Sequence, residues 1–280
     1  MSTPTKPSPA PLGLSMPPEW APHAATWTSW PFDDELWVGH LDGVRAEFAR
    51  LVATISRFEP VLVNVRDDEV EEDARRRLEL VAGRPDNVSF NRVALNDVWF
   101  RDNGPIFVHR AGGDRAVSLT DWRFNAWGGK YAPWDDDDRA PAQVAQRLGM
   151  LRHEVDLVLE GGSIEVNGEG VCLTTQSCLL SPERNPGVGV EEIEEALRRY
   201  LGVTEVVWLA AGLEGDHTDG HIDTIVRFSD ASTILCSVED DENDPNHATM
   251  SANLAQLRGW NERRGETQRV VTLPLPARRM

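Results

Sequence analysis

The sequence predicts an α/β fold built from repeated units, and three observations support this prediction. Segments of helical periodicity alternate with β-rich runs over most of the 280 residues. Three strands are followed by segments of one plan, in which an acidic residue near a glycine precedes a strand, a polar turn and a second strand. Hydrophobic residues make up 40% of the chain, which is enough to bury a sizeable core.

Helices and strands are expected in turn along the chain, because the spacing of apolar residues changes from one segment to the next. The expected helices span residues 36–57, 69–82, 141–150, 190–201 and 247–262. The expected strands are "PVLVNV" (60–65), "VSFNRVAL" (88–95), "HEVDLVLE" (153–160), "EVVWLA" (205–210) and "RVVTLPL" (269–275).

The repeated segments are "WFRDNGPIFVHRAGGDRAVSL", "VLEGGSIEVNGEGVCLTT" and "GHIDTIVRFSDASTILCS". Asp102 precedes Glu160 by 58 residues, and Glu160 precedes His221 by 61. Such regular spacing is typical of units arranged around an axis or along a stack. A single acid before a glycine is often only a turn signal. Three acidic residues at the same place in successive repeats predict that these positions converge on a central pocket.

The charge balance limits the classes of binding partner that we expect. The chain has 28 Lys and Arg against 46 Asp and Glu, a formal net charge of -18, which serves solubility and repels nucleic-acid phosphates and anionic lipids. We therefore expect no nucleic acid and no membrane as partner, and no apolar run predicts a transmembrane helix. Residues 1–15 are rich in Pro, Ser and Thr without the apolar core of an export signal, which predicts a disordered lead-in and a cytoplasmic protein.

The three cysteines are Cys172, Cys178 and Cys236. They lie in apolar or neutral surroundings without C-x-x-C spacing, which favours reduced, buried thiols over disulfides or a metal cage. We therefore predict neither a metal nor a cofactor.

The segment "EGDHTDGHIDTI" (214–225) holds two histidines, three aspartates and a glutamate. His217 and His221 are four residues apart, a spacing that binds zinc when both lie on one helix. The alternation of apolar and polar residues in "GHIDTIVRF" instead predicts a strand with His221 and Asp223 on the same side, and the Asp-Gly pair before His221 disfavours a helix. A structural histidine, hydrogen-bonded in the core, is the remaining alternative.

A pocket lined by Asp102, Glu160, Asp223 and His221 suits a planar cation. Guanidinium presents its N–H donors in a fixed fork, so two aspartates from different units can hold it by opposite edges. A neighbouring carboxylate favours protonated His221, which then acts as general acid toward a leaving amine. Trp99 either offers a face to the cation or to an alkyl tail, or packs in the core as most tryptophans do.

Seven motifs are distributed over nearly all of residues 16–276: "MPPEWAPHAATWTSWP", "NDVWFRDNGP", "FNAWGGKY", "LEGGSIEVNGEG", "CLLSPERNP", "GHIDTIVRF" and "EDDENDPNH". Together they resemble the agmatine deiminases, within the guanidine-modifying superfamily that includes bacterial peptidyl-arginine deiminases. The resemblance implies a pseudo-five-fold α/β propeller, the pentein fold, with the active site on its axis and a single deiminase domain over residues 16–280.

The resemblance also implies hydrolysis of agmatine to N-carbamoylputrescine and ammonia, on a route to the polyamine putrescine. Matched by position, Asp102 and Asp223 grip the guanidinium, and His221 acts as general acid and base. Glu160 stabilises the charged substrate and helps to set the protonation of His221, while Trp99 lines the pocket. A small guanidinium compound is thus the expected partner, and a homo-oligomer of unspecified symmetry is implied.

The family attacks the guanidinium carbon with a cysteine thiolate from a glycine-rich segment near its C-terminus, forming a thiouronium intermediate that water hydrolyses. No such segment occurs in the 280 residues, and Cys178 matches a non-catalytic cysteine of the family. The expectation is a deiminase domain that stops before its nucleophile and needs that segment for turnover. Two alternatives stay open: a peptidyl-arginine deiminase, and a non-catalytic guanidine- or polyamine-binding protein.

Overall fold

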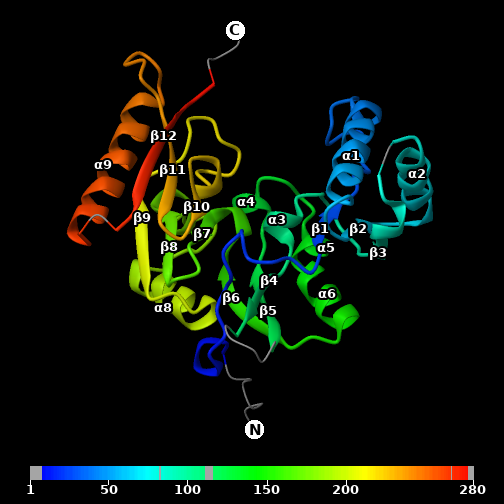
Figure 1. Ribbon diagram of the computed structural model, residues 1–280, viewed down its shortest axis with the longest axis horizontal. Helices are drawn as coiled ribbons and strands as arrows, with labels where there is room; N and C mark the ends of the chain where they lie inside the picture. The colour runs from blue at the N-terminus through cyan, green and yellow to red at the C-terminus, as the bar shows by residue number, and fades with distance from the viewer. Residues whose placement is uncertain (1–7, 82, 111–115, 266, 277–280) are drawn as a thin grey trace. The chain divides into compact units, whose positions relative to one another are not determined.

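The computed structural model has the predicted α/β character and divides into two compact units (Figure 1). The described residues are 8–81, 83–110, 116–265 and 267–276. The larger unit, which we name the hairpin unit, consists of Met1–Ala21, Pro105–Ala132 and Gly149–Met280. The smaller, which we name the parallel unit, consists of Pro22–Gly104 and Pro133–Leu148. That both belong to one deiminase domain stays a prediction.

The parallel unit is built on three parallel strands in the order β1-β2-β3. Its elements are β1 (Thr26–Ser29), α1 (Leu41–Ile55), β2 (Val61–Val65), α2 (Asp68–Glu79), η2 (Pro85–Asn87), β3 (Val88–Arg92), α3 (Phe100–Asn103), α5 (Asp135–Asp138) and α6 (Ala140–Leu148). Helices α1 and α2 make the crossovers that parallel strands require. Val61 and Val63 of the central strand share one buried core with Val52 and Ala74 of these helices.

The hairpin unit contains three sheets of one design, β4-β5-β6, β7-β8-β9 and β10-β11-β12. In each, an antiparallel hairpin is extended by a parallel third strand. The elements are η1 (Ala10–Leu12), β4 (Ile106–His109), β5 (Val117–Arg123), α4 (Ala126–Gly129), β6 (Arg152–Val158), η3 (Gly161–Ser163), β7 (Ile164–Val166), β8 (Val171–Thr175), α7 (Gln176–Leu179), α8 (Val190–Leu201), β9 (Glu205–Leu209), η4 (Ile222–Thr224), β10 (Val226–Asp230), β11 (Thr233–Val238), α9 (His247–Arg263) and β12 (Arg269–Pro274). The predicted hairpin repeat is confirmed, although residues 111–115 of the first turn lie outside the described residues.

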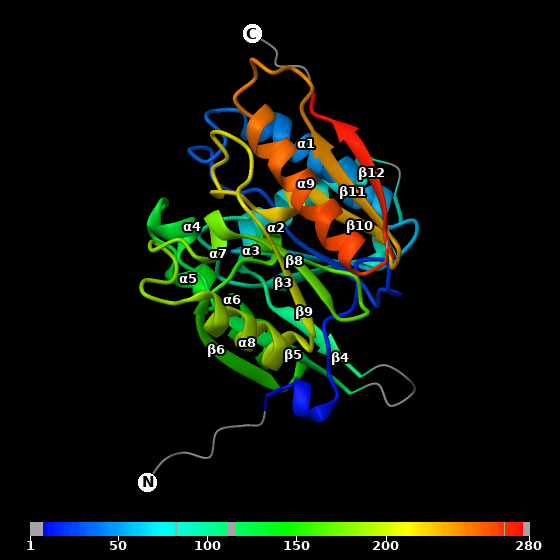
Figure 2. The same cartoon turned by 90° about the vertical axis from the view of Figure 1, so that its left-hand side faces the viewer.

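The long helices of this unit follow the predicted spans. Helix α8 ends where predicted because Gly202 adopts a left-handed φ of 69° and its N–H bonds to the Arg198 carbonyl at 3.1 Å. Each helix also reaches the preceding sheet: α8 contacts β6, and α9 contacts β9 as well as β11, beside which Figure 2 shows it. None of the helices in the described ranges combines the length and apolar surface that a membrane span requires.

Part of the predicted disordered lead-in is held against the hairpin unit, although residues 1–7 lie outside the described residues. Leu14 is buried, and Ser15 pairs with His109 in an isolated antiparallel bridge. The Met16 N–H donates to the Leu201 carbonyl at 2.9 Å. One apolar anchor and these backbone bonds fix residues 8–16 despite their Pro-rich composition.

Candidate active site

Glu160 lies at the point where β6 ends and η3 begins. Its carbonyl accepts the Ser163 N–H at 3.0 Å and the Ser163 hydroxyl at 2.6 Å, so the Gly-Gly-Ser turn fixes its backbone. Its side chain has no exposed surface. A carboxylate removed from water needs partners within the protein.

Arg184, which the sequence analysis does not predict, is the main partner. Its side chain is also fully buried, and its Nε donates to the two carboxylate oxygens of Glu160 at 2.9 and 3.1 Å. Its other nitrogens donate to Asp219 Oδ2 at 3.2 Å and to the Thr218 carbonyl at 2.6 Å. The motif "CLLSPERNP" contains this residue, but a turn sequence does not indicate where its side chain points.

These partners keep Glu160 ionised. Burial alone would raise its pKa, but the adjacent ring of His221 and the charge of Arg184 outweigh burial and lower the pKa below its ordinary value. For Arg184, burial opposes the charge, yet the carboxylate of Glu160 more than compensates and the pKa is raised. Each member of this buried ion pair therefore depends on the other.

His221 faces the same carboxylate from the start of η4. Its Nε2 lies 3.8 Å from Glu160 Oε2, and its ring is almost completely buried. The backbone N–H of His221 donates to Thr218 Oγ1 at 3.1 Å. The structure thus brings together two positions that open successive repeats, as the repeat predicts, while their catalytic roles stay predictions.

The strand predicted over "GHIDTIVRF" begins later than expected. Residues Ile222–Thr224 form η4, and β10 starts at Val226. The Thr224 hydroxyl donates to the His221 carbonyl at 2.8 Å and tightens this stretch into a turn. The prediction that His221 and Asp223 share one side of a strand is therefore wrong, and Asp223 lies half-buried on η4.

Residues 212–220, which we name the 212–220 loop, lead from β9 to His221, and the two ends of the loop touch. A Cβ on Gly220 would lie 2.7 Å from the Gly212 nitrogen, and Gly220 has a φ of 109°, so this closure requires glycine. The Ser177 hydroxyl donates to the Asp219 carbonyl at 2.8 Å. The loop is therefore fixed where it enters the site.

Three candidate metal ligands meet in this cluster. Glu160, Cys178 and His221 each place one ligand atom within 4.8 Å of the others, and zinc accepts such a set. The guanidinium of Arg184 already neutralises Glu160 and would stand beside a divalent ion, which disfavours metal binding. His217, the other histidine of the predicted zinc spacing, belongs to no such group in the described part of the chain.

The three cysteines are buried, as predicted. Burial raises the pKa of Cys172 to about 12 and that of Cys236 to about 11, so neither is a thiolate near neutral pH. Cys178 lies within the cluster, where its Sγ donates to Glu160 Oε2 at 3.9 Å.

Asp102 and Trp99 belong to the parallel unit. Asp102 is buried on α3, and its N–H donates to the Trp99 carbonyl at 2.8 Å. Trp99 is 51% exposed and packs against Trp37, with ring centroids 6.2 Å apart, which excludes a core role for this ring. That Asp102 and Trp99 meet Glu160 and His221 stays a prediction.

A second buried carboxylate supports the loop before α3. Asp137 of α5 is 2% exposed and accepts the backbone N–H groups of Asn96 at 2.8 Å and Asp97 at 3.2 Å. In return, Asn96 Oδ1 accepts the Asp136 N–H at 2.8 Å. Burial raises the pKa of Asp137 to about 7, because it outweighs these hydrogen bonds and Asp97 adds like charge.

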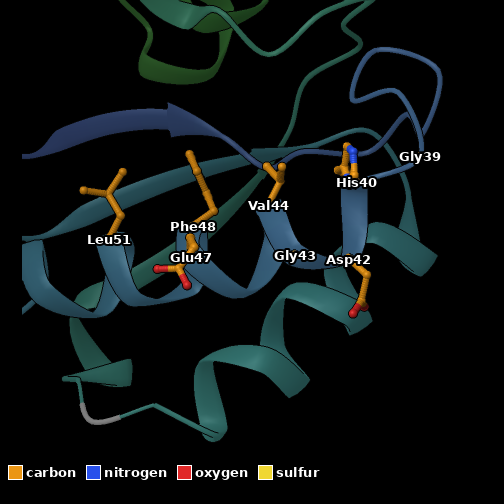
Figure 3. Close-up of a pocket in the computed structure, with 8 residues that line it drawn as sticks. All are labelled: Gly39, His40, Asp42, Gly43, Val44, Glu47, Phe48 and Leu51. Carbon is orange, nitrogen blue, oxygen red and sulfur yellow. The ribbon is translucent and has the colours of Figure 1, made fainter. Parts of the chain in front are cut away.

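A groove of about 770 Å³ in the parallel unit holds none of the predicted site residues. It runs along α1, with Phe48 and Leu51 pointing to the same side of the helix (Figure 3). We therefore assign no chemistry to it.

The chain is similar to known proteins over nearly its whole length. The family model of the Porphyromonas-type peptidyl-arginine deiminases matches residues 15–280. An agmatine deiminase of Pseudomonas aeruginosa (strain LESB58) is 39% identical over 281 residues, which cover 99% of this chain and 74% of that protein.

Solved structures give the same result. The agmatine deiminase of Enterococcus faecalis matches with a TM-score of 0.88 and 32% identity, over 98% of this chain and 74% of that one. A C. jejuni agmatine deiminase with substrate bound matches with a TM-score of 0.82 and 29% identity, over 94% of this chain and 74% of that one. The chain therefore belongs to the family of the Porphyromonas-type peptidyl-arginine deiminases and agmatine deiminases.

Proposed function

We propose that this protein hydrolyses agmatine to N-carbamoylputrescine and ammonia, on a route to putrescine. In this reaction a C–N bond of the guanidinium breaks, oxygen from water takes its place on the carbon, and the imino nitrogen leaves as ammonia. The observation that carries the proposal is the fully buried, ionised Glu160 beside His221 in a chain related to agmatine deiminases over nearly its whole length.

The site residues divide the work by charge. Asp102 and Asp223 hold the guanidinium by two edges, since carboxylates accept its N–H groups in pairs. Glu160 adds negative charge that favours the cationic substrate and protonated His221, which delivers a proton to the leaving nitrogen. The exposed ring of Trp99 supports its role as a pocket wall.

The attacking group is assigned to none of the three cysteines. Cys172 and Cys236 have raised pKa values, and the Cys178 proton is directed at the carboxylate that the substrate needs. The implied mechanism uses a thiolate from a glycine-rich segment.

The implied architecture and setting belong to the same proposal. The three sheets of one design in the hairpin unit and the match to the E. faecalis enzyme support a pseudo-five-fold propeller. The proposal also includes that the protein forms a homo-oligomer and is located in the cytoplasm.

The test is ammonia release from agmatine by a chain that includes the glycine-rich segment, with a calorimetric binding titration on the same sample. Asp102→Asn and Asp223→Asn should each lower kcat/KM at least about 1000-fold, because each removes one charge from the grip on the guanidinium. Near-normal release from either variant would disprove this geometry. Binding without release would identify the non-catalytic alternative.

Peptidyl-arginine deimination is the second candidate, because the matching family model carries that description. The same assay with a blocked arginine peptide separates the two activities. A higher kcat/KM for the peptide than for agmatine would favour this candidate.

A further inference from the structure

We propose that Lys130 and Arg184 belong to one positioning network that holds the Glu160–His221 pair in place through the 212–220 loop. The inference rests on the proposed function, since it deepens the account of the same site. Lys130 acts only through other residues, so it is a positioning residue.

The network begins at a strained turn in "FNAWGGKY". Ala126, Trp127, Gly128 and Gly129 have φ values of 52°, 56°, 88° and 80°, a left-handed turn. Non-glycine residues take this conformation only where their surroundings impose it, and such strain gathers at functional sites. Asn125 stabilises the turn, because its Oδ1 accepts the Gly128 N–H at 2.9 Å.

The turn presents two side chains to the 212–220 loop. The Lys130 ammonium donates to Asp219 Oδ1 at 2.5 Å and to the His217 carbonyl at 2.7 Å. The Tyr131 hydroxyl bonds to His217 Nδ1 at 2.9 Å. The Tyr131 ring packs edge-on against Trp127, with centroids 5.8 Å apart, so the strained turn fixes the position of Tyr131.

The loop passes the constraint inward. A chain of alternating charge runs through Lys130, Asp219, Arg184 and Glu160, from a lysine side chain that is 33% exposed to a glutamate side chain with no exposed surface. The turn also contacts the segment of Arg184 directly, because Asn125 Nδ2 donates to the carbonyl of Glu183, the residue before Arg184, at 2.9 Å.

His221 is joined to the same loop because its backbone N–H donates to the Thr218 hydroxyl. Arg184 bonds both the Thr218 carbonyl and the Glu160 carboxylate. One guanidinium therefore fixes the acid and the segment that carries the histidine. A loosened loop changes the separation of the two groups without removing either of them.

The experiment compares Lys130→Met with Lys130→Arg and uses Arg227→Met as the matched control, each in a chain that includes the glycine-rich segment. Arg227 lies in the same unit and its Nε also bonds a fully buried carboxylate, that of Glu165, at 2.8 Å. Lys130→Met should lower kcat for agmatine about tenfold with KM within about twofold, because the substrate contacts remain. Lys130→Arg should restore most of kcat, and the control should stay near wild type.

Amide hydrogen exchange gives a readout that needs no turnover. Exchange at Thr218, Gly220 and His221 should become about tenfold faster in Lys130→Met and stay unchanged in the control. Arg184→Lys should also make amide exchange at these positions faster. Because lysine keeps the positive charge beside Glu160, this variant should still fold. Unchanged exchange in both site variants, or equal kcat in Lys130→Met and wild type, would overturn the network. A wild-type protein that neither binds nor hydrolyses agmatine would defeat the proposed function, while the exchange data would still decide the network.

Discussion

Glu160 in the hairpin unit and Asp137 in the parallel unit are both removed from water, yet burial has opposite outcomes for their charge. Glu160 is 0% exposed and its pKa is lowered, whereas Asp137 is 2% exposed and its pKa is raised to about 7. Both accept hydrogen bonds. Glu160 faces the guanidinium of Arg184 and the ring of His221, whereas Asp137 faces like charge from Asp97. Counter-charge, rather than the number of hydrogen bonds, therefore decides whether a buried carboxylate stays ionised here.

The difference also separates two uses of a buried acid. Asp137 ties backbone N–H groups of the loop before α3, a task that a neutral acceptor performs equally well. Glu160 supplies negative charge to a cation, which a neutral group cannot do. Four changes test this contrast.

Glu160→Gln, in a chain that includes the glycine-rich segment, keeps the size of the side chain and removes the charge. We expect kcat/KM for agmatine to fall at least about 1000-fold, because the protonated imidazole and the guanidinium both lose their buried anion. Glu165→Gln is the control, since Glu165 is equally buried but bonds Arg227, and its activity should stay within about threefold of wild type. A Glu160→Gln variant with a tenth of wild-type activity would contradict the role of this charge.

Arg184→Met should make Glu160 behave like Asp137. Removing one member of a buried pair costs about 3–5 kcal/mol of unfolding free energy at pH 7. In the wild type, the lowered pKa of Glu160 contributes stability above its ordinary value of 4.5 that is lost as pH falls through the lowered pKa.

In Arg184→Met the pH dependence that Glu160 contributes to stability changes sign, so the unfolding free energy should fall as pH rises. Urea unfolding from pH 4 to pH 8, followed in the hairpin unit by hydrogen exchange, measures this change. Parallel pH profiles for the variant and the wild type would show that Arg184 does not control Glu160.

Asp137→Asn is the complementary change in the parallel unit. The raised pKa means that Asp137 contributes stability below 3.8 that is lost as pH rises through about 7. The amide removes this loss, so unfolding free energy at pH 8 should increase by about 1–2 kcal/mol and stay nearly constant at pH 4. A decrease at pH 8 would indicate that the loop needs an ionised acceptor.

Metal removal should have the smallest effect. Exhaustive chelation should leave agmatine binding and any ammonia release unchanged, because Arg184 already supplies the positive charge next to Glu160. Loss of activity on chelation with recovery on adding zinc would instead favour the cluster of Glu160, Cys178 and His221 as a metal site.

Much of the fold follows from local sequence signals. The span of α8 could be predicted because its apolar spacing ends at Gly202, and the hairpins because each joins alternating residues through a polar turn. The pairing of Glu160 with His221 follows from their equivalent places in successive repeats, 61 residues apart.

The network around that pair has no such local signal. Arg184 and Lys130 lie in turns without periodicity, and Lys130 contacts Asp219, 89 residues further along the chain. The η4 turn is missed because the Thr224 hydroxyl, rather than the apolar pattern, determines the backbone there. Long-range polar contacts of this kind depend on the finished fold.

The N-terminal anchor has a consequence for biosynthesis. Met16 bonds the Leu201 carbonyl, and Ser15 bridges to His109, so this segment makes its last contact long after it has been synthesised. At about 5–20 residues per second, Met16 waits on the order of 10–40 seconds for Leu201 to be synthesised. During that interval the core that receives Leu14 is incomplete, because Leu197 and Leu201 belong to it, so this segment completes its packing only after helix α8 has been synthesised.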